Sequence, residues 1–184
     1  MNDEQVSFDF LLGSHMEWEA FLEKRLNHGT KSVPGQARAW PKGLKGSISH
    51  CELTPELTLF VAALSHTHSI GVDLQELISP SITEEVRDLV GSEEEFQLLK
   101  PFSAEKAVSL LFSAKEALYK LTYPITQQFL DFREVSLSSV RMKSEDLYLQ
   151  FEQMSVEVRC QLRSLTLPNL SKKQFIIALA KVIE

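Results

Sequence analysis

The order in which helical and strand-like patterns follow one another limits the fold of this chain more than any other sequence feature. Helical spacing of apolar residues predicts helices over 17–27, 81–90, 93–99 and 104–121. Shorter alternating or continuously apolar runs predict strands over 46–50, 57–64, 69–74, 135–137, 147–151, 155–161 and 175–180. A helix, then strands, then helices, then strands is typical of an α+β domain and not of a doubly wound α/β fold.

Capping and breaking residues set the expected limits of these elements. Ser92 stands where it can cap the helix over 93–99, and Gly29 is expected to end the first helix. Prolines and glycines predict a loop over 32–46. The long helix is expected to stop before Pro124, because proline lacks the backbone N–H that a helix interior needs.

Length and charge narrow the class of protein. A chain of 184 residues suits one domain, or one domain built of two similar halves. Its net charge of −6 argues against general nucleic-acid binding. Two cysteines give neither a disulfide framework nor metal-ligand spacing. The first twelve residues contain Asp3, Glu4 and Asp9, whereas a signal peptide needs basic residues there. No apolar run reaches membrane-spanning length, so we expect a cytoplasmic protein.

A basic segment stands out in this acidic chain. Residues 24–51 contain no Asp or Glu, and they carry Lys24, Arg25, Lys31, Arg38, Lys42 and Lys45. The segment closes with Gly46-Ser47-Ile48-Ser49-His50, whose small residues allow backbone N–H groups to approach phosphate oxygens. Such a segment can attract a polyanion, although cationic loops are also typical of an ordinary solvated surface.

One acidic residue follows directly on an apolar strand. Ile70-Gly71-Val72 leads into Asp73, which a rigid strand end could present as a metal ligand. The same pattern also fits a plain strand followed by a capped turn.

The long helix carries two different faces. One face is apolar throughout: Leu110, Leu111, Ala114, Ala117, Leu118 and Leu121. The opposite face holds Phe112, Lys115, Glu116, Tyr119 and Lys120. Glu116 and Lys120 could form an ordinary i,i+4 ion pair on a solvated surface. The two aromatic side chains instead suggest that this face lines a cleft.

Together these segments resemble the 4′-phosphopantetheinyl transferase family, and specifically its siderophore branch of the enterobactin synthase component D type. The matching motifs are Trp40-Pro41-Lys42-Gly43, Gly46-Ser47-Ile48-Ser49-His50-Cys51, Gly71-Val72-Asp73 and Phe112-Ser113-Ala114-Lys115-Glu116-Ala117-Leu118-Tyr119-Lys120. A looser match, Glu19-Ala20-Phe21-Leu22-Glu23-Lys24-Arg25, resembles the family's upstream helix that ends in arginine. The resemblance extends from about residue 17 to about residue 135.

The resemblance implies a fold and an activity. The fold would be two similar α+β halves, approximately 1–70 and 71–184, forming a single domain with the active site in the cleft between them. The chain would transfer the phosphopantetheine arm of coenzyme A to a serine of an apo acyl, peptidyl or aryl carrier protein, as in siderophore or other nonribosomal peptide biosynthesis. Since two halves of one chain could complete the cleft, we expect a monomer.

The resemblance also implies site residues. Asp73 and Glu116 would bind Mg²⁺, which proteins usually hold by one or two carboxylates together with waters and substrate phosphates. Gln75 stands where the family often has a second acidic residue, so we expect weaker Mg²⁺ binding than in a three-carboxylate site. Glu116 is our candidate for the base that activates the carrier serine, and Lys120 would stabilise developing charge.

Coenzyme A would be held mainly by basic residues. By the resemblance, Ser49, His50, Lys42 and Lys120 would contact its phosphates, with Lys115 placed nearby. Arg25 would lie near the 3′-phosphate.

Two other functions stay open at this point. Gln75 also suits a degenerate, non-catalytic relative that only binds coenzyme A or a carrier protein. A coenzyme A-dependent acyltransferase would need a base such as His or a nucleophile such as Cys51. His66 and His68 have no acidic neighbour at suitable spacing, and we interpret them as surface residues.

Overall fold

The computed structural model describes residues 6–26, 38–152, 154–166 and 172–182. Its elements in chain order are β1 (Val6–Gly13), α1 (His15–Leu26), β2 (Lys45–Thr54), β3 (Leu57–Ser65), β4 (Ile70–Glu76), α2 (Pro80–Val90), α3 (Glu93–Leu98), α4 (Ala104–Thr126), a 3₁₀ turn (Phe132–Glu134), β5 (Leu137–Lys143), β6 (Asp146–Phe151), β7 (Val156–Leu165) and β8 (Lys173–Val182). Strands and helices are segregated along the chain, and the predicted α+β class is confirmed.

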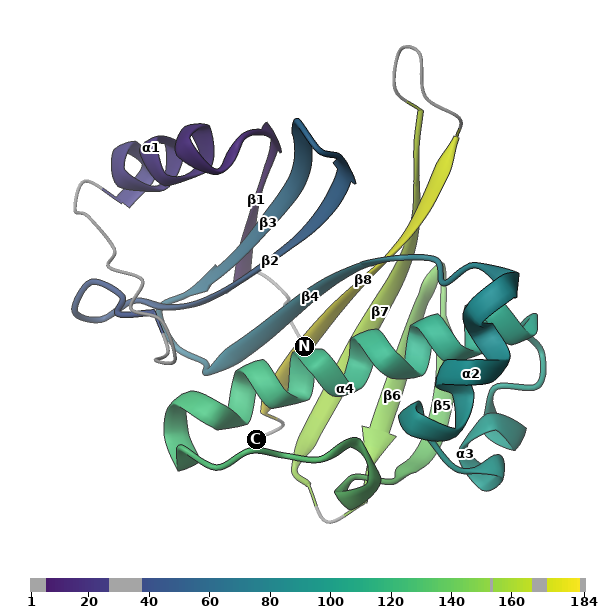
Figure 1. The fold of residues 1–184 in the computed structure, drawn as a ribbon. Coiled ribbons are helices and arrows are strands. Elements are labelled where there is room, and N and C mark those ends of the chain that lie inside the picture. The colour runs from purple at the N-terminus through teal and green to yellow at the C-terminus, as the bar shows by residue number, and fades with distance from the viewer. Residues whose placement is uncertain (1–5, 27–37, 153, 167–171, 183–184) are drawn as a thin grey trace.

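The strands form two antiparallel sheets. The first has the order β1-β3-β2, and the second has the order β4-β8-β7-β6-β5. Helix α1 lies over the smaller sheet, and α4 runs across one face of the larger sheet (Figure 1). The chain passes from the first sheet to the second between Ser65 and Ile70. That the two parts are similar halves with a cleft between them stays a prediction.

Apolar side chains form three clusters that fix these layers. The largest fills the space between α4 and the five-stranded sheet, and includes the whole apolar face predicted for the long helix. A second cluster lies between the two sheets, where Val72 of β4 meets Val61 of β3. The third, around Trp18 and Phe60, joins α1 to the smaller sheet. Each cluster removes apolar surface from water, which is the main favourable contribution to folding.

Most predicted elements are present, with several differences in extent. Strand β1 was not predicted, and β5 covers Leu137–Lys143 where the sequence suggested 135–137. Helix α4 continues to Thr126 and includes Pro124. A proline in the last turn removes only one helical hydrogen bond, and Gln127 closes the helix in a left-handed conformation with its N–H bonded to Tyr123 O.

Other expectations concern caps and parts of the chain outside the described residues. Ser92 caps α3 as predicted, and it forms a full capping box with Glu95. The predicted end of the first helix at Gly29 and residues 32–37 of the predicted loop lie outside the described residues. Among the described residues, no helix is both long and apolar enough to cross a membrane.

Candidate active site

Strand β4 brings the smaller sheet and helix α4 together at one point. Its side chains alternate, so Val72 enters the core between the sheets while Gly71 and Asp73 face α4. An ideal Cβ on Gly71 would lie 2.0 Å from Ala117 O and 2.5 Å from Leu121 N. Only glycine therefore allows α4 to pass this close to β4, and this contact sets the distance between Asp73 and the helix.

The carboxylate of Asp73 is the centre of a buried polar cluster. Ser113 Oγ of α4 donates to its Oδ2 at 2.8 Å, and Ser49 Oγ of β2 donates to its Oδ1 at 3.0 Å. Lys120 Nζ lies 2.7 Å from Oδ1 and 2.9 Å from Ser49 Oγ. Asp73 is only 5% exposed. Side chains of two elements, β2 and α4, thus hold the carboxylate that β4 carries in a fixed orientation, as an active site requires.

Glu116 lies beside this cluster without joining it. Ser113, Glu116 and Lys120 are spaced three and four residues apart, so they form one stripe along α4. Among the described residues Glu116 has neither a hydrogen bond nor an ion pair. Burial raises the pKa of Glu116 and the nearby Asp73 raises it further, while Lys120 opposes them. A half-buried carboxyl group with these neighbours is a candidate proton acceptor or metal ligand.

The structure separates Ser49 from His50, which we had expected to act together on phosphates. Successive side chains of β2 point to opposite faces of the sheet, so Ser49 joins Asp73 while His50 packs against Phe60 and His15, with ring centroids 5.7 and 5.1 Å away. Partial burial lowers the pKa of His50, and the charges of His15 and Lys120 act in the same direction.

A cavity of 500 Å³ collects other predicted residues. Arg25 at the end of α1 and Lys42 in the loop before β2 both line it. His66 lines it as well. Its ring nitrogen Nδ1 lies 3.1 Å from Gly43 O, and since a carbonyl oxygen can only accept, Nδ1 is the donor of this hydrogen bond. Arg25 also pairs with Asp9 at 3.1 Å. The cavity is therefore basic and large enough for a nucleotide-sized anion.

A second cavity, of 340 Å³, lies against the C-terminal half of α4. Tyr119 and Lys120 line it from α4, and Trp40 and Lys45 line it from the opposite side. Phe112, the other aromatic residue of this helix face, packs instead on Phe132, with ring centroids 5.4 Å apart. Of the two aromatic side chains expected to line a cleft, the structure places Tyr119 at a cavity.

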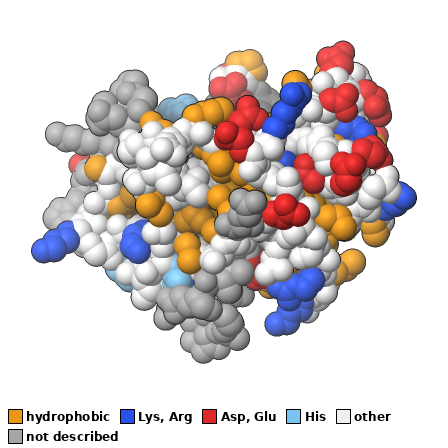
Figure 2. Space-filling view, turned by 90° about the horizontal axis from the view of Figure 1, so that it is seen from below, with side chains coloured by type: hydrophobic (Ala, Val, Ile, Leu, Met, Phe, Trp, Pro, Cys, Tyr) orange, Lys and Arg blue, Asp and Glu red, His pale blue; other side chains and the backbone are white. Residues whose placement is uncertain are grey.

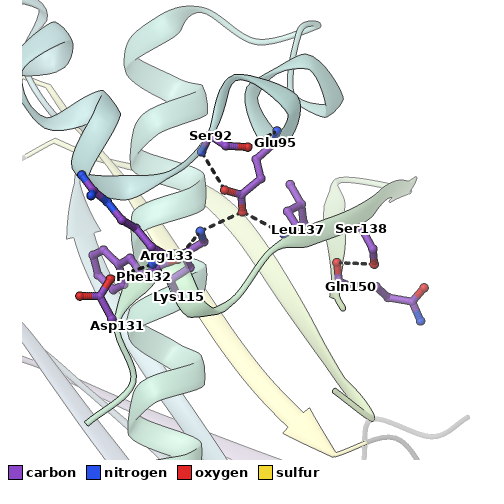
Figure 3. A network of polar contacts seen from close by, with 9 residues as sticks. All are labelled: Ser92, Glu95, Lys115, Asp131, Phe132, Arg133, Leu137, Ser138 and Gln150. Atoms are coloured by element: carbon purple, nitrogen blue, oxygen red, sulfur yellow. Dashed lines mark hydrogen bonds and ion pairs between the residues drawn. The ribbon is translucent and has the colours of Figure 1, made fainter. Parts of the chain in front are cut away.

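The expected position of Lys115 near the phosphates needs correction. Its side chain is 2% exposed, and its ammonium group lies 2.8 Å from Glu95 Oε1 and 2.8 Å from Phe132 O (Figure 3). Burial lowers the pKa of Lys115, and the bond to Glu95 opposes this. Lys120 follows Lys115 by five positions, which places the two about 140° apart around the helix. The two lysines therefore serve different clusters.

Glu95 connects three elements through this buried pair. Besides Lys115, it accepts hydrogen bonds from the backbone N–H groups of Ser92 and Leu137, each at 2.8 Å (Figure 3). The start of α3, the middle of α4 and the start of β5 are thereby joined at one carboxylate. Glu95 fixes the position of α4 on the side away from the stripe of Glu116 and Lys120.

Gln75 lies two residues after Asp73 on the same side of β4. Its amide nitrogen donates to Glu76 O at 2.7 Å, which leaves its carbonyl oxygen for another group. Within the described part of the chain, no three His, Cys, Asp or Glu side chains are grouped as a metal site. The carboxylates available to a metal here are Asp73 and Glu116, and its other positions would need amide oxygens, waters or substrate oxygens.

Sequence reasoning missed one residue of these sites and the location of another. Ser113 was part of a recognised motif, and its position three residues before Glu116 could have identified it. His66 is exposed, as the sequence predicted. It also lines the cavity that contains Arg25 and Lys42, which no sequence spacing indicates, because the turn between β3 and β4 places it there. Burial raises the pKa of the Cys51 thiol, which argues against a nucleophilic role and against the acyltransferase alternative.

Comparisons with known proteins agree with this geometry. A model of the 4′-phosphopantetheinyl transferase superfamily matches residues 69–180. Enterobactin synthase component D of Salmonella typhimurium is 35% identical over 100 residues, which cover 50% of this chain and 39% of that protein. The 4′-phosphopantetheinyl transferase Npt of Nocardia iowensis is 36% identical over 106 residues, or 55% of this chain and 45% of that protein.

A third relative, the 4′-phosphopantetheinyl transferase Svp of Streptomyces mobaraensis, is 32% identical over 112 residues, or 58% of this chain and 44% of that protein. The matched segment thus covers less than half the length of each of these three relatives. The superfamily match spans more than half of this chain and contains Asp73, Glu116 and Lys120. The chain belongs to the 4′-phosphopantetheinyl transferase superfamily.

Proposed function

We propose that this chain transfers the 4′-phosphopantetheine arm of coenzyme A to a serine of an apo carrier protein. The observation that carries the proposal is the buried cluster in which Ser49, Ser113 and Lys120 hold Asp73, with Glu116 beside it. The printed names of the relatives, which are phosphopantetheinyl transferases and enterobactin synthase components, support the same reaction.

The residues of the cluster fit Mg²⁺. This ion prefers carboxylate oxygens, and it usually keeps several positions for waters and substrate phosphates. Asp73 and Glu116 supply two carboxylates from neighbouring elements, and Glu116 has no described protein partner that a metal would have to displace. The carbonyl oxygen of Gln75 could hold a third position directly or through water. When bound, Mg²⁺ would neutralise charge on the pyrophosphate of coenzyme A.

The protein side chains would perform the remaining chemistry. The carrier serine oxygen attacks the phosphorus next to the pantetheine arm, and the bond from that phosphorus to the bridging oxygen breaks. Glu116 takes the serine proton, directly or through water. Lys120 stabilises negative charge as it develops, and 3′,5′-ADP leaves.

Coenzyme A would extend from this cluster to the basic cavity. Arg25, Lys42 and His66 line a space that suits the nucleotide end of the molecule. Ser49 and His50, on opposite faces of β2, could then contact the phosphates only from different sides. His50 lies on the α1 side, and Ser49 lies with Lys120 on the Asp73 side.

The proposal also covers the pathway, the oligomeric state and the cellular location of the protein. Relatives named enterobactin synthase component D favour peptidyl or aryl carrier domains of a siderophore pathway. Npt and Svp are named only by their transferase activity, so other carriers of nonribosomal peptide or fatty-acid type stay within the proposal. We further propose a monomer that acts in the cytoplasm.

Intact-mass spectrometry of a panel of apo carrier domains, incubated with the protein, coenzyme A and Mg²⁺, tests the proposal. We expect a phosphopantetheine-sized mass increase that disappears with EDTA and in Glu116→Ala, and that persists in Glu94→Ala, a matched change of an exposed glutamate on α3. If no carrier gains mass while coenzyme A still binds in calorimetry, the chain is a non-catalytic binding relative. If no carrier gains mass and coenzyme A does not bind either, the assignment is refuted.

A further inference from the structure

The wall of the basic cavity contains one side chain whose charge changes near neutral pH, His66. The charged groups around it come from each neighbouring element: Arg25 from α1, Asp9 from β1, Lys42 from the loop before β2 and Lys45 from β2. Lysine, arginine and aspartate side chains keep their charge near neutral pH, whereas histidine gains or loses its charge between about pH 5 and 8. The charge that the cavity presents to a ligand therefore varies with the state of His66.

Local hydrogen bonds hold the turn that carries His66. The Ser65 hydroxyl accepts hydrogen bonds from the backbone N–H groups of Thr67 and His68, at 3.3 and 3.1 Å. Ser65 is 1% exposed, and Lys45 Nζ donates to the carbonyl oxygen of Thr67 at 3.3 Å. The backbone around His66 is thus held in place, so the imidazole ring starts from a fixed point at the cavity wall.

A further hydrogen bond fixes the tautomer of His66. Its Nδ1 donates to Gly43 O at 3.1 Å, because a carbonyl oxygen can only accept. Gly43 has a φ of +80° in a turn in which Leu44 N donates to Pro41 O at 3.0 Å. A positive φ at this turn position favours glycine, and the turn holds the accepting carbonyl in place. With its proton on Nδ1, neutral His66 offers only an acceptor at Nε2.

A fully ionised phosphate group also carries only acceptor oxygens. Neutral His66 therefore has no donor at Nε2 with which to bind it. Protonated His66 has N–H groups on both ring nitrogens, so Nε2 can donate to a phosphate while Nδ1 stays bonded to Gly43 O. The opposite charge of a bound phosphate favours this protonated form. Phosphate binding at this wall of the cavity therefore takes up a proton wherever the free imidazole is neutral.

The charge distribution favours an anionic ligand at this end of the molecule. Figure 2 shows acidic side chains gathered at the end where α2 and α3 lie, and Lys, Arg and His side chains at the end that carries the smaller sheet. The cavity belongs to the second end, since α1, β1 and the loop before β2 all contribute to its wall. A nucleotide is therefore repelled least where His66 and Lys42 can reach it.

We propose that protonated His66 binds a phosphate of the nucleotide end of coenzyme A, so that nucleotide binding to this cavity takes up a proton. Lys42 attracts the same anion, and among the described residues it forms no ion pair, whereas Arg25 is paired with Asp9. Nucleotide affinity then falls as pH rises, because the proton must be supplied from a solution that holds fewer of them. This inference rests on the proposed transferase function and adds a residue and a proton to its nucleotide site.

Calorimetry of 3′,5′-ADP binding, in two buffers of different ionisation enthalpy, measures the proton uptake. His66→Gln is the test variant, because a glutamine amide can donate a hydrogen bond without taking up a proton. At about pH 7.5 the wild-type protein should take up more protons than His66→Gln, by up to about one per site, and at about pH 5.5 the difference should vanish. Protons that titrate on the nucleotide contribute to both proteins and cancel in this difference.

Two further measurements sharpen the test. His68→Gln is the matched control, because His68 belongs to the same turn but is not among the residues that line the cavity, and its proton uptake should equal that of the wild type. The wild-type affinity for 3′,5′-ADP should fall more steeply with pH than that of His66→Gln, by up to about tenfold for each pH unit, which is the slope for one proton.

The outcomes separate this inference from the proposed function. Equal proton uptake by the wild type and His66→Gln at both pH values would refute the role of His66, and so would a wild-type protein that does not bind 3′,5′-ADP. Transfer to apo carriers, followed by intact mass, decides the function separately. A protein that modifies a carrier without this uptake keeps its function, whereas one that shows the uptake but modifies no carrier keeps only its nucleotide site.

Discussion

Replacing Gly71 by alanine should disable the site through the backbone alone. The added methyl carbon would lie 2.0 Å from Ala117 O, whereas a close carbon–oxygen contact is about 3.3 Å. The clashing atoms of α4, Ala117 O and Leu121 N, belong to the backbone and cannot rotate away as a side chain could. Helix α4 would therefore have to move by about 1.3 Å. The carboxylate of Asp73 is two residues along β4, and Lys120 is next to the displaced Leu121 N.

This displacement predicts two effects of different size. Overpacking a well-filled core typically costs about 1–3 kcal/mol of unfolding free energy. Misplacement of catalytic groups by about 1 Å can cost roughly 100-fold in rate, because the distance from Lys120 to Asp73 and the position of Glu116 both depend on α4. Gly71→Ala should thus stay folded at low temperature but transfer phosphopantetheine roughly 100-fold more slowly.

Urea unfolding and intact-mass transfer rates, measured well below the melting temperature, give the two quantities. Gly13→Ala is the matched control, because its added methyl carbon would meet the Glu17 side chain, and the one tight contact, 2.8 Å to Oε2, is with the end of that flexible side chain. We expect that control to keep its transfer rate. A Gly71→Ala protein that keeps both its stability within about 0.5 kcal/mol and its full rate would show that α4 can move freely over β4, and the argument would fail.

Three further predictions address single side chains. Burial raises the pKa of Glu116 in the fold, so its ionisation opposes folding, and the stability contributed by its protonated form is lost as pH rises through the folded-state pKa. Glu116→Gln should therefore be more stable than wild type at neutral pH, with the difference vanishing in acid. Urea unfolding between pH 4 and 8 checks this. Lys115→Met leaves the Glu95 carboxylate buried without its cation and should lower the unfolding free energy by about 3–5 kcal/mol. In a double-mutant cycle, adding Glu95→Gln should recover much of that loss. If the effects of the two changes simply add, the pairing is contradicted. His66→Ala should weaken the binding of 3′,5′-ADP, measured by calorimetry, by roughly tenfold, which is the scale of one hydrogen bond to a charged group. The control variant His68→Ala should bind 3′,5′-ADP with the wild-type affinity. Equal affinities in the two variants would show that His66 does not contribute to binding in this cavity.

The sequence predicted the elements whose patterns are local. The apolar face of α4 and the cap at Ser92 follow from helical periodicity and capping chemistry, and both are confirmed. Strand β1 was not predicted, although Val6, Phe8 and Phe10 alternate with polar residues as in a half-buried strand. The end of α4 was placed too early, since the cost of a proline depends on how many turns follow it.

The positions of site residues could be predicted only where a single motif gives both the residue and the side of the helix on which it lies. Glu116 and Lys120 share a helix stripe, so their common location could be read from spacing. Lys115 belongs to the same motif, yet Glu95 binds it, and no pattern in the sequence indicates that α3 packs against that side of α4. The contact of Ser49 with Asp73 depends on how β2 lies beside β4, where Ser47 Oγ accepts a hydrogen bond from Val72 N at 2.9 Å. Such contacts between distant segments need the assembled fold.

The two ion pairs of α4 explain why this helix can serve as the rigid part of the site. On one side Lys115 is anchored to Glu95, and on the other side Lys120 is anchored to Asp73. Between them Gly71 sets the depth of the helix on β4. Rotation of α4 would break at least one of these ion pairs, so the helix face that carries Glu116 is fixed before any ligand arrives. Preorganisation of this kind lowers the cost of aligning charged groups during a reaction, and it places that cost in folding instead.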